Sequence, residues 1–141
     1  MILVLIESPF APIQGPEAIG LTDKQYAAAI ADNIAFAKAA VRDCLDRNSA
    51  PYASHLFFPQ DGIMDDRDPK KRKIGIEAGL LWGSKADLTA VYIDRGMSQG
   101  MIHGIKRAEA EGRPIVYRVL ATGSEFMTYS EAILHRDKQI A

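Results

Sequence analysis

The sequence has 141 residues, of which 48% are hydrophobic and 25% charged, and its formal net charge is −1. These values are typical of one globular domain with its own core, and they give no general attraction to nucleic acid. The single cysteine, Cys44, excludes an intrachain disulfide and metal sites of the CxxC kind, and it favours a cytoplasmic protein.

The chain begins with a continuous apolar run at residues 2–6, which predicts a strand covered on both faces. The run is too short for a membrane span, and no basic segment precedes it as in a signal peptide. Prolines and glycines at 10–21 predict a long loop. Thr22 and Gln25 then form a capping-box pattern, and apolar residues recur every three or four positions behind it, which predicts a helix ending near residue 48.

Strand and helix patterns alternate along the rest of the chain. Aromatic residues in alternation at 52–58 predict a second strand, and apolar runs at 88–93 and 114–120 predict a third and a fourth. Three further helices are indicated by the N-cap residues that precede them. These caps are Asp68 before a helix to about residue 83, Ser98 before a helix that closes at Gly112, and Thr128 in a capping box with Glu131.

The alternation of strands and helices predicts a parallel sheet with right-handed crossovers and helices on both faces. We therefore expect a single three-layer α/β/α domain over residues 1–141, with a flavodoxin-like parallel sheet of four to five strands in the order 2-1-3-4. Residues 121–141 would form a C-terminal extension that contains the last helix. In such a sheet, ligands bind beyond the carboxyl ends of the strands where the winding reverses, here between strands one and three.

Polar and glycine-rich segments follow the strands on either side of that crevice. The loop after strand one begins with Glu7 and Ser8, and the turn after strand three spans residues 94–104 with Gly96 and Gly100. Glycines let a ligand approach the backbone, and the helix start offers free amides. The spacing lacks GxGxxG and a P-loop lysine, so neither a dinucleotide site nor a kinase is indicated. The sequence predicts a small-molecule site at this turn.

The strings that carry a family resemblance are SHLFFPQDGIMDD, RKIGIEAGL and ADLTAVYIDRGMSQGMIHGI. Over roughly residues 2–120, the chain resembles a small family of phage and prophage proteins of unknown function, a branch of the nucleoside 2-deoxyribosyltransferase-like superfamily. The resemblance implies a nucleoside or nucleotide ligand, cleavage or transfer at the N-glycosidic bond, and a homo-oligomer. The compartment would be the cytoplasm, of the host if the protein is phage-encoded. We expect no cofactor, metal, nucleic acid or membrane partner.

Chemistry of this kind needs a carboxylate under the anomeric carbon and an acid that protonates the leaving base. The superfamily usually supplies the carboxylate as a glutamate after a Gly-Met pair. By the resemblance, that position is held by Ile102, which can neither attack nor stabilise a cation. We expect Glu7 or Asp94 to be the sugar-side carboxylate, and His103 or Asp94 to protonate the base.

Other residues are predicted to contact the ligand. Phe10 is the candidate for stacking on a base, and Arg95 for meeting a phosphate, whereas Arg72 is expected to pair with the neighbouring aspartates. Capping or turn roles are open alternatives for Ser98 and Asp94. The full predicted ligand-binding set is Ser8, Pro9, Phe10, His55, Asp66, Glu77, Arg95, Gly96, Ser98, Gly100 and Met101.

Two functions from different classes follow from these residues. The first is an enzyme that hydrolyses or transfers an N-glycosidic bond. The second is a non-catalytic binder that sequesters a nucleotide-like metabolite, because the usual glutamate is missing. A third reading, a protein that retains the fold alone, is disfavoured by the polar residues in both loops. Apolar residues beyond the needs of a small sheet, such as Leu81, Trp82 and Met127, support association between copies.

Overall fold

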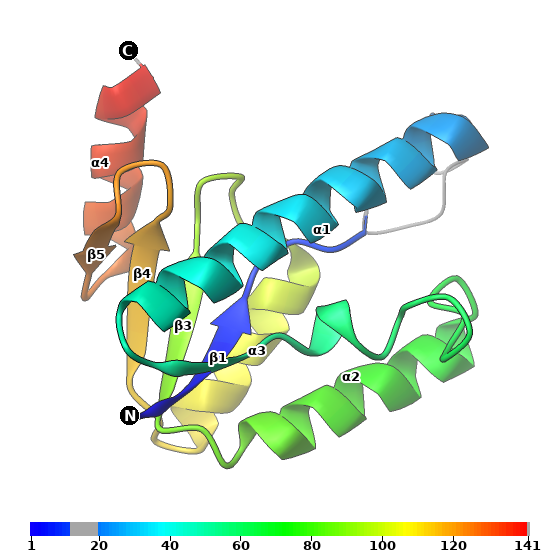
Figure 1. Ribbon diagram of the computed structural model, residues 1–141, viewed down its shortest axis with the longest axis horizontal. Helices are drawn as coiled ribbons and strands as arrows, with labels where there is room; N and C mark the ends of the chain where they lie inside the picture. The colour runs from blue at the N-terminus through cyan, green and yellow to red at the C-terminus, as the bar shows by residue number, and fades with distance from the viewer. Residues whose placement is uncertain (12–19, 141) are drawn as a thin grey trace.

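The computed structural model of the protein describes residues 1–11 and 20–140 (Figure 1). Most of the loop expected at 10–21 lies outside these described residues. The strands are β1 (Leu3–Glu7), β2 (Ala50–Tyr52), β3 (Leu88–Tyr92), β4 (Ile115–Val119) and β5 (Ser124–Phe126). The α-helices are α1 (Asp23–Asp46), α2 (Pro69–Gly83), α3 (Gln99–Ala110) and α4 (Tyr129–Ile140), and η2 (Ser54–Leu56) is a short 3₁₀ helix.

The strands form one sheet in the order β2-β1-β3-β4-β5. All neighbours are parallel except β4 and β5, which are antiparallel. The α/β class and the expected order of the first four strands are therefore confirmed. The antiparallel pair differs from an all-parallel sheet because β5 follows β4 through a tight turn at Gly123, where φ is +67°, and a turn this short can join only antiparallel strands.

The second strand is shorter than the segment predicted at 52–58. β2 pairs with β1 only from Ala50 to Tyr52. The chain then turns into η2, where the amides of Leu56 and Phe57 donate to carbonyls three residues earlier. These local bonds satisfy the backbone in place of a longer ladder, so the prediction of a strand to residue 58 is wrong. The turn carries His55 towards the carboxyl end of β1.

The predicted helix caps are confirmed. The Thr22 hydroxyl accepts from the Gln25 amide at 3.1 Å, and the Gln25 side chain accepts from the Thr22 amide at 2.9 Å. Asp68 caps α2, Ser98 caps α3 and Thr128 caps α4, each through its side-chain oxygen. Each cap satisfies amides that have no partner inside the helix, which fixes where the helix begins.

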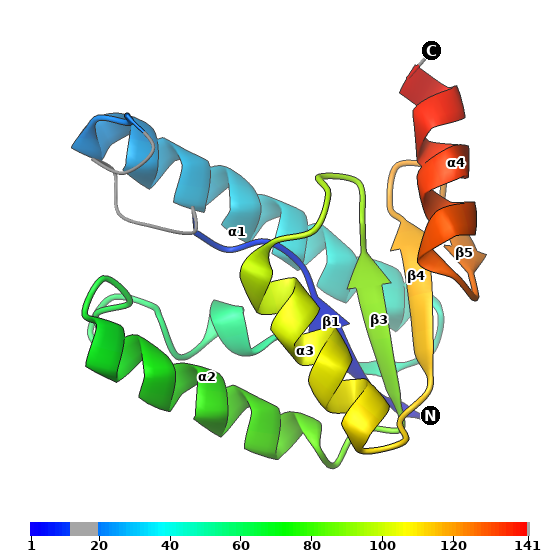
Figure 2. The same cartoon turned by 180° about the vertical axis from the view of Figure 1, so that it is seen from behind.

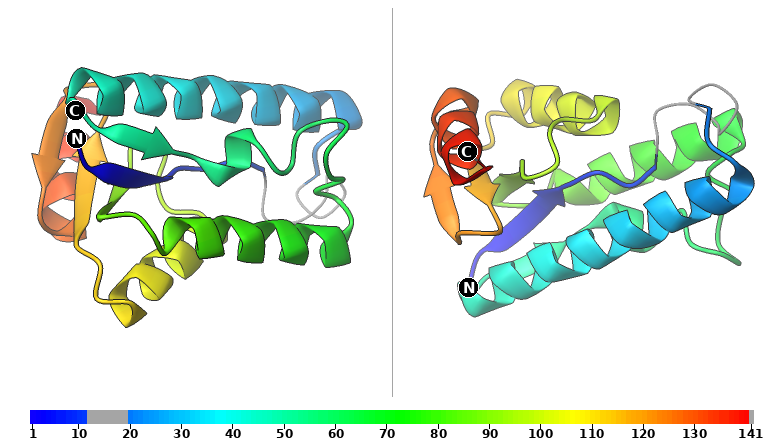
Figure 3. Two further views of the ribbon diagram at one scale, coloured as in Figure 1. Left: turned by 60° about the horizontal axis from the view of Figure 1, so that its bottom comes forward. Right: turned by 90° about the horizontal axis from the view of Figure 1, so that it is seen from above.

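Helices cover both faces of the sheet. Figure 3 shows α1 on one face and α2 and α3 on the other, and Figure 2 shows α4 beside β4 and β5, away from α2. The core on the α1 face includes Phe36, Cys44 and Tyr92. The core on the α3 face includes Ile93 and Met101. Within the part of the chain that the structure describes, no helix is long and apolar enough to cross a membrane.

Candidate functional site

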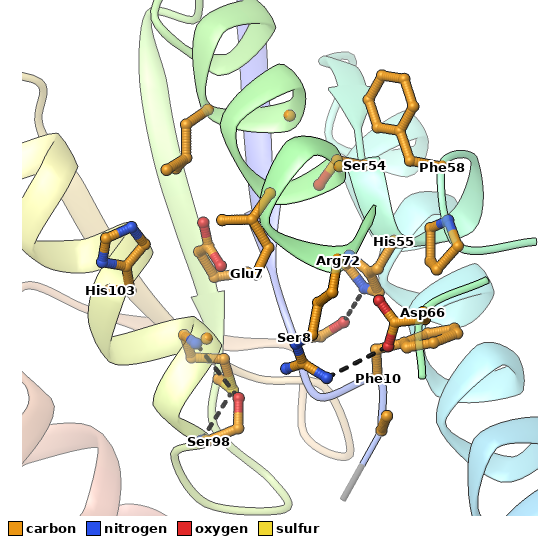
Figure 4. A pocket seen from close by; sticks show the side chains of 18 of the residues that line it. Glu7, Ser8, Phe10, Ser54, His55, Phe58, Asp66, Arg72, Ser98 and His103 are labelled. Carbon is orange, nitrogen blue, oxygen red and sulfur yellow. Dashed lines mark hydrogen bonds and ion pairs between the residues drawn. The ribbon is translucent and has the colours of Figure 1, made fainter. Parts of the chain in front are cut away.

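A pocket opens beyond the carboxyl end of β1, on the face of the sheet that α2 and α3 cover (Figure 4). Its walls come from the end of β1, from η2, from α2 and from the first turns of α3. Because α3 follows β3, the pocket lies between strands β1 and β3, where the winding of the sheet reverses. The cavity volume is about 130 Å³, close to the ~150 Å³ of an engineered cavity that holds benzene. The enclosed part therefore fits one ring.

Most of the residues predicted for the site line this pocket. They are Glu7, Ser8, Phe10, His55, Asp66, Ser98, Gly100, Met101 and His103. Five predicted residues do not line it, and these are Pro9, Glu77, Asp94, Arg95 and Gly96. The pocket thus brings together predicted residues from four separate segments of the chain.

Glu7 is the carboxyl group of the pocket. It is the last residue of β1, and its side chain points towards α3 (Figure 4). There it lies against Gly104. A Cβ atom on Gly104 would overlap the Glu7 carboxyl, with the second oxygen, Oε1, only 2.8 Å away. Any other residue at 104 would therefore have to displace the carboxyl. The glycine leaves the space that holds Glu7 in the pocket.

The environment of Glu7 favours its protonated form. Burial raises the pKa of this carboxyl from 4.5 to about 8, and the charge of Arg113 opposes the rise. Arg113 is itself buried, donates to Thr89 Oγ1 at 2.9 Å and pairs with Glu111 at 2.9 Å. Among the described residues, its Nη2 has no hydrogen-bond partner. At neutral pH most of the Glu7 carboxyl is therefore neutral.

A serine and a histidine form a second polar pair in the pocket. The Ser8 Oγ and the His55 Nε2 are 2.7 Å apart, and both residues line the cavity. The Phe10 ring meets the His55 ring edge-on, with centroids 6.4 Å apart, which fixes the plane of the imidazole. Burial lowers the pKa of His55 to about 4, so the imidazole is neutral at pH 7 and suited to hydrogen bonding with an uncharged group.

An ion pair stands beside these groups. Arg72, near the start of α2, contacts the Asp66 carboxylate at 3.2 Å, which confirms the expectation that it pairs with a neighbouring aspartate. Burial raises the pKa of Asp66, and the Arg72 guanidinium opposes that rise. Because both partners line the pocket, the pair adds two charges of opposite sign and no net charge.

The first turn of α3 closes the pocket from the other side. Ser98 Oγ accepts from the Met101 amide at 3.2 Å, and the Gln99 and Gly100 amides precede the first intrahelical bond. Gly100 has open space around it, because a Cβ atom at this position would have Ser98 Oγ as its nearest neighbour, at 3.9 Å. His103 is exposed and lines the cavity. The turn thus offers backbone donors and an imidazole to a ligand.

Asp94 has a structural role in a turn, which was the alternative to a role in ligand binding or catalysis. Its two carboxylate oxygens accept from the amides of Leu120 at 2.8 Å and Ala121 at 2.9 Å. These bonds tie the end of β3 to the turn after β4. Since Asp94 is also outside the pocket, its position does not support the predicted catalytic role.

The other exceptions also have local partners. Arg95 donates to the Asp32 carboxylate at 2.7 Å, and Glu77 pairs with Arg107 at 3.8 Å. Gly96 has φ of +84° and forms the turn after β3. Ile102, the position assigned by resemblance to the family glutamate, does not line the pocket. A carboxylate at 102 would therefore lie outside the cavity lining, whereas position 104 lies against the Glu7 side chain.

Several lining residues were missed by the sequence interpretation, notably Ser54, Phe58 and Met64. The signal that could have found them is the recurrence of glycine every four residues in α2. A Cβ atom on Gly79 would lie 2.7 Å from Ser54, and one on Gly75 would lie 2.7 Å from Met64. Small residues on one helix face indicate that another chain segment approaches closely. Among the residues described, no group of three His, Cys, Asp or Glu could hold a metal ion.

The overlap between position 104 and Glu7 yields a stability test. Gly104→Ala should lower the free energy of unfolding by about 1–3 kcal/mol, because the added methyl group forces the carboxyl out of place. Gly100→Ala is the matched control, since it lies in the same helix with open space; it should be neutral or stabilise by about 0.5–1 kcal/mol. Chemical denaturation measures both. If Gly104→Ala behaves like Gly100→Ala, Glu7 does not occupy that space.

The comparison with known proteins identifies a family and no activity. Residues 2–118 match a family model described as a domain of unknown function (DUF7768). No curated protein matches the chain significantly. The family match covers β1 to the end of α3 and nearly all of β4, and so it includes every residue that lines the pocket. The chain therefore belongs to the DUF7768 family.

Proposed function

We propose that the protein binds a nucleoside or nucleotide and hydrolyses or transfers its N-glycosidic bond, with Glu7 as the carboxylate on the sugar side. The observation that carries the proposal is the place of the Glu7 carboxyl, which lies against Gly104 in a cavity that fits one ring. A carboxylate so placed can attack an anomeric carbon or stabilise an oxocarbenium-like centre.

The reaction assigns roles to Glu7, to His103 and to the Ser8–His55 pair. Glu7 forms a bond to the anomeric carbon while the bond from that carbon to the base breaks, and the electron pair leaves with the base. His103, at the opening, donates the proton that the base takes up. Water or a second base then displaces Glu7 from the sugar. The uncharged Ser8–His55 pair would hydrogen-bond a sugar hydroxyl.

The sheet and the resemblance support the same proposal. The order β2-β1-β3-β4 puts the pocket at the switch point, as in a flavodoxin-like winding. The resemblance is to a phage and prophage family that branches from the nucleoside 2-deoxyribosyltransferase-like superfamily, and it implies a nucleoside-type ligand and a place in the host cytoplasm. Glu7, rather than a residue of α3, would then provide the carboxylate, because isoleucine holds position 102, to which the resemblance assigns the family glutamate.

A second function is favoured by one observation. With a pKa of about 8, most of the Glu7 carboxyl is protonated at neutral pH, and a protonated carboxyl donates a hydrogen bond but does not attack carbon. The same pocket would then bind or sequester a nucleotide-like metabolite without breaking a bond. The two functions differ in whether base is released.

Base release tests the enzymatic proposal. The protein is incubated with a panel of nucleosides, deoxynucleosides and their 5′-monophosphates, and free base is separated by chromatography. We expect Glu7→Gln to lower the rate by about 10³-fold or more, the scale of losing a catalytic carboxylate. Asp94→Asn, whose residue lies outside the pocket, should retain the rate of the wild-type protein within about threefold.

The pH profile assigns the role of Glu7. A nucleophilic carboxylate must be ionised, so in His103→Asn, which lacks the proposed acid, the residual rate should rise with pH and level off above about 8. In that variant, a rate that falls above pH 8 would assign the protonated form of Glu7. The double variant Glu7→Ala/Gly104→Asp, which places a carboxylate on α3 close to the space that the Glu7 carboxyl occupies, should recover part of the activity that Glu7→Ala loses. Ligand-induced thermal stabilisation without base release would leave the binding function and reject the enzymatic one.

Association between copies is part of the proposal. Three large apolar side chains of α2 are exposed at helical spacing, and these are Ile74 at 68%, Leu81 at 67% and Trp82 at 68%. Exposed apolar residues in one stripe are typical of an interface. If α2 is the homo-oligomer contact, Trp82→Glu should shift the mass measured by light scattering to that of a monomer. If the mass of an oligomer does not change, α2 is not the contact between the copies.

A further inference from the structure

We infer that the pocket is a receptor for a small organic cation, and that a protonated amine in a five- or six-membered ring binds with its charge against the Glu7 carboxylate. Such binding does not require that the protein break a bond, and it therefore goes beyond the proposed reaction. Nucleosides do not belong to this class of ligands.

The charge balance of the lining residues carries the inference. Asp66 and Arg72 compensate each other through their contact at 3.2 Å. Glu7 is then the acidic group left over, and among the described residues no side chain donates a hydrogen bond to it. Arg113, the cation whose charge acts on Glu7, pairs with Glu111 and donates to Thr89, and no hydrogen bond or ion pair in the described part of the chain joins it to Glu7. An ionised Glu7 thus lacks a counter-ion of its own, and a ligand with one positive charge would supply it.

The other walls suit the same ligand. Phe10 and Phe58 line the cavity with two methionines, Met64 and Met101. Aromatic faces attract cations, and polarisable sulfur packs well against a ring. His55 stays neutral at pH 7 because burial lowers its pKa to about 4, so it does not repel a cation. The volume of about 130 Å³ matches one saturated ring.

Binding of a cation should be coupled to proton release. Burial keeps the pKa of Glu7 near 8 even though the charge of Arg113 opposes the rise. A cation in contact with the carboxyl favours its ionised form and lowers the pKa further. At pH 7 the free carboxyl holds its proton and the bound one does not, so close to one proton leaves per ligand bound. The dissociation constant should then fall by up to about tenfold for each pH unit from 6 to 8.

The test compares two rings of the same size and shape that differ in charge. 3-Hydroxypyrrolidine is protonated throughout this pH range, and 3-hydroxytetrahydrofuran is neutral. Isothermal titration of the full chain at pH 6, 7 and 8, in two buffers with different ionisation enthalpies, gives affinity and proton release. We expect the amine to bind at least tenfold more tightly than the ether at pH 8, with close to one proton released at pH 7.

Variants separate Glu7 from the other groups that face it. Glu7→Gln should remove the preference for the amine and its pH dependence. Glu77→Gln is the matched control, because Glu77 lies on α2 outside the pocket, and it should change neither. His103→Asn should keep the pH dependence, which excludes the imidazole on α3 as its source. Asp66→Asn, which leaves Arg72 uncompensated, should weaken amine binding.

Three results would overturn the inference. They are equal affinity for the two rings, amine binding without proton release, and no binding of either ring at millimolar concentration. The wild-type measurements decide the matter even if Glu7→Gln fails to fold. Failure of base release, with amine binding intact, would reject the proposed reaction and leave this inference standing.

Discussion

The carboxyl group of Glu7 occupies the space that any side chain at position 104 would need. This contact joins the end of β1 to the first half of α3. Through it, a strand residue lines a cavity that helices enclose. The pocket depends on it in two ways. The glycine permits the approach, and the approach removes the carboxyl from water. The position of the Glu7 carboxyl and its protonation state therefore both follow from its contact with Gly104.

The same burial makes the pocket chemically unusual. Desolvation raises the pKa of Glu7 and lowers that of His55, so both groups favour their neutral forms at pH 7. Aspartate and arginine in the pocket cancel as a pair. What remains is a ring-sized space with neutral donors and acceptors and one carboxyl that, at pH 7, ionises mainly when a positive charge approaches. A developing oxocarbenium-like centre and a bound ammonium ion would both meet that condition.

Much of this architecture could be predicted from the sequence, because caps and apolar periodicity are local signals. Thr22, Asp68, Ser98 and Thr128 begin their helices as expected. Contacts distant in sequence were beyond such reasoning. The choice between Glu7 and Asp94 as the site carboxylate depended on which one the β4–β5 turn binds. Gly104, and not Ile102, lies against Glu7 because of the face that α3 turns towards β1. The spacing of residues in one sequence does not determine that face.

The protonation state of Glu7 is the central claim of this account, and a carboxyl titration tests it most directly. In protein labelled with ¹³C at glutamate carboxyl carbons, Glu7→Gln identifies the Glu7 resonance by its loss. That resonance should titrate with a midpoint near pH 8 in the wild-type protein. A midpoint near the ordinary value of 4.5 would contradict the account, because it would mean that the carboxyl remains hydrated and does not lie in the space beside Gly104.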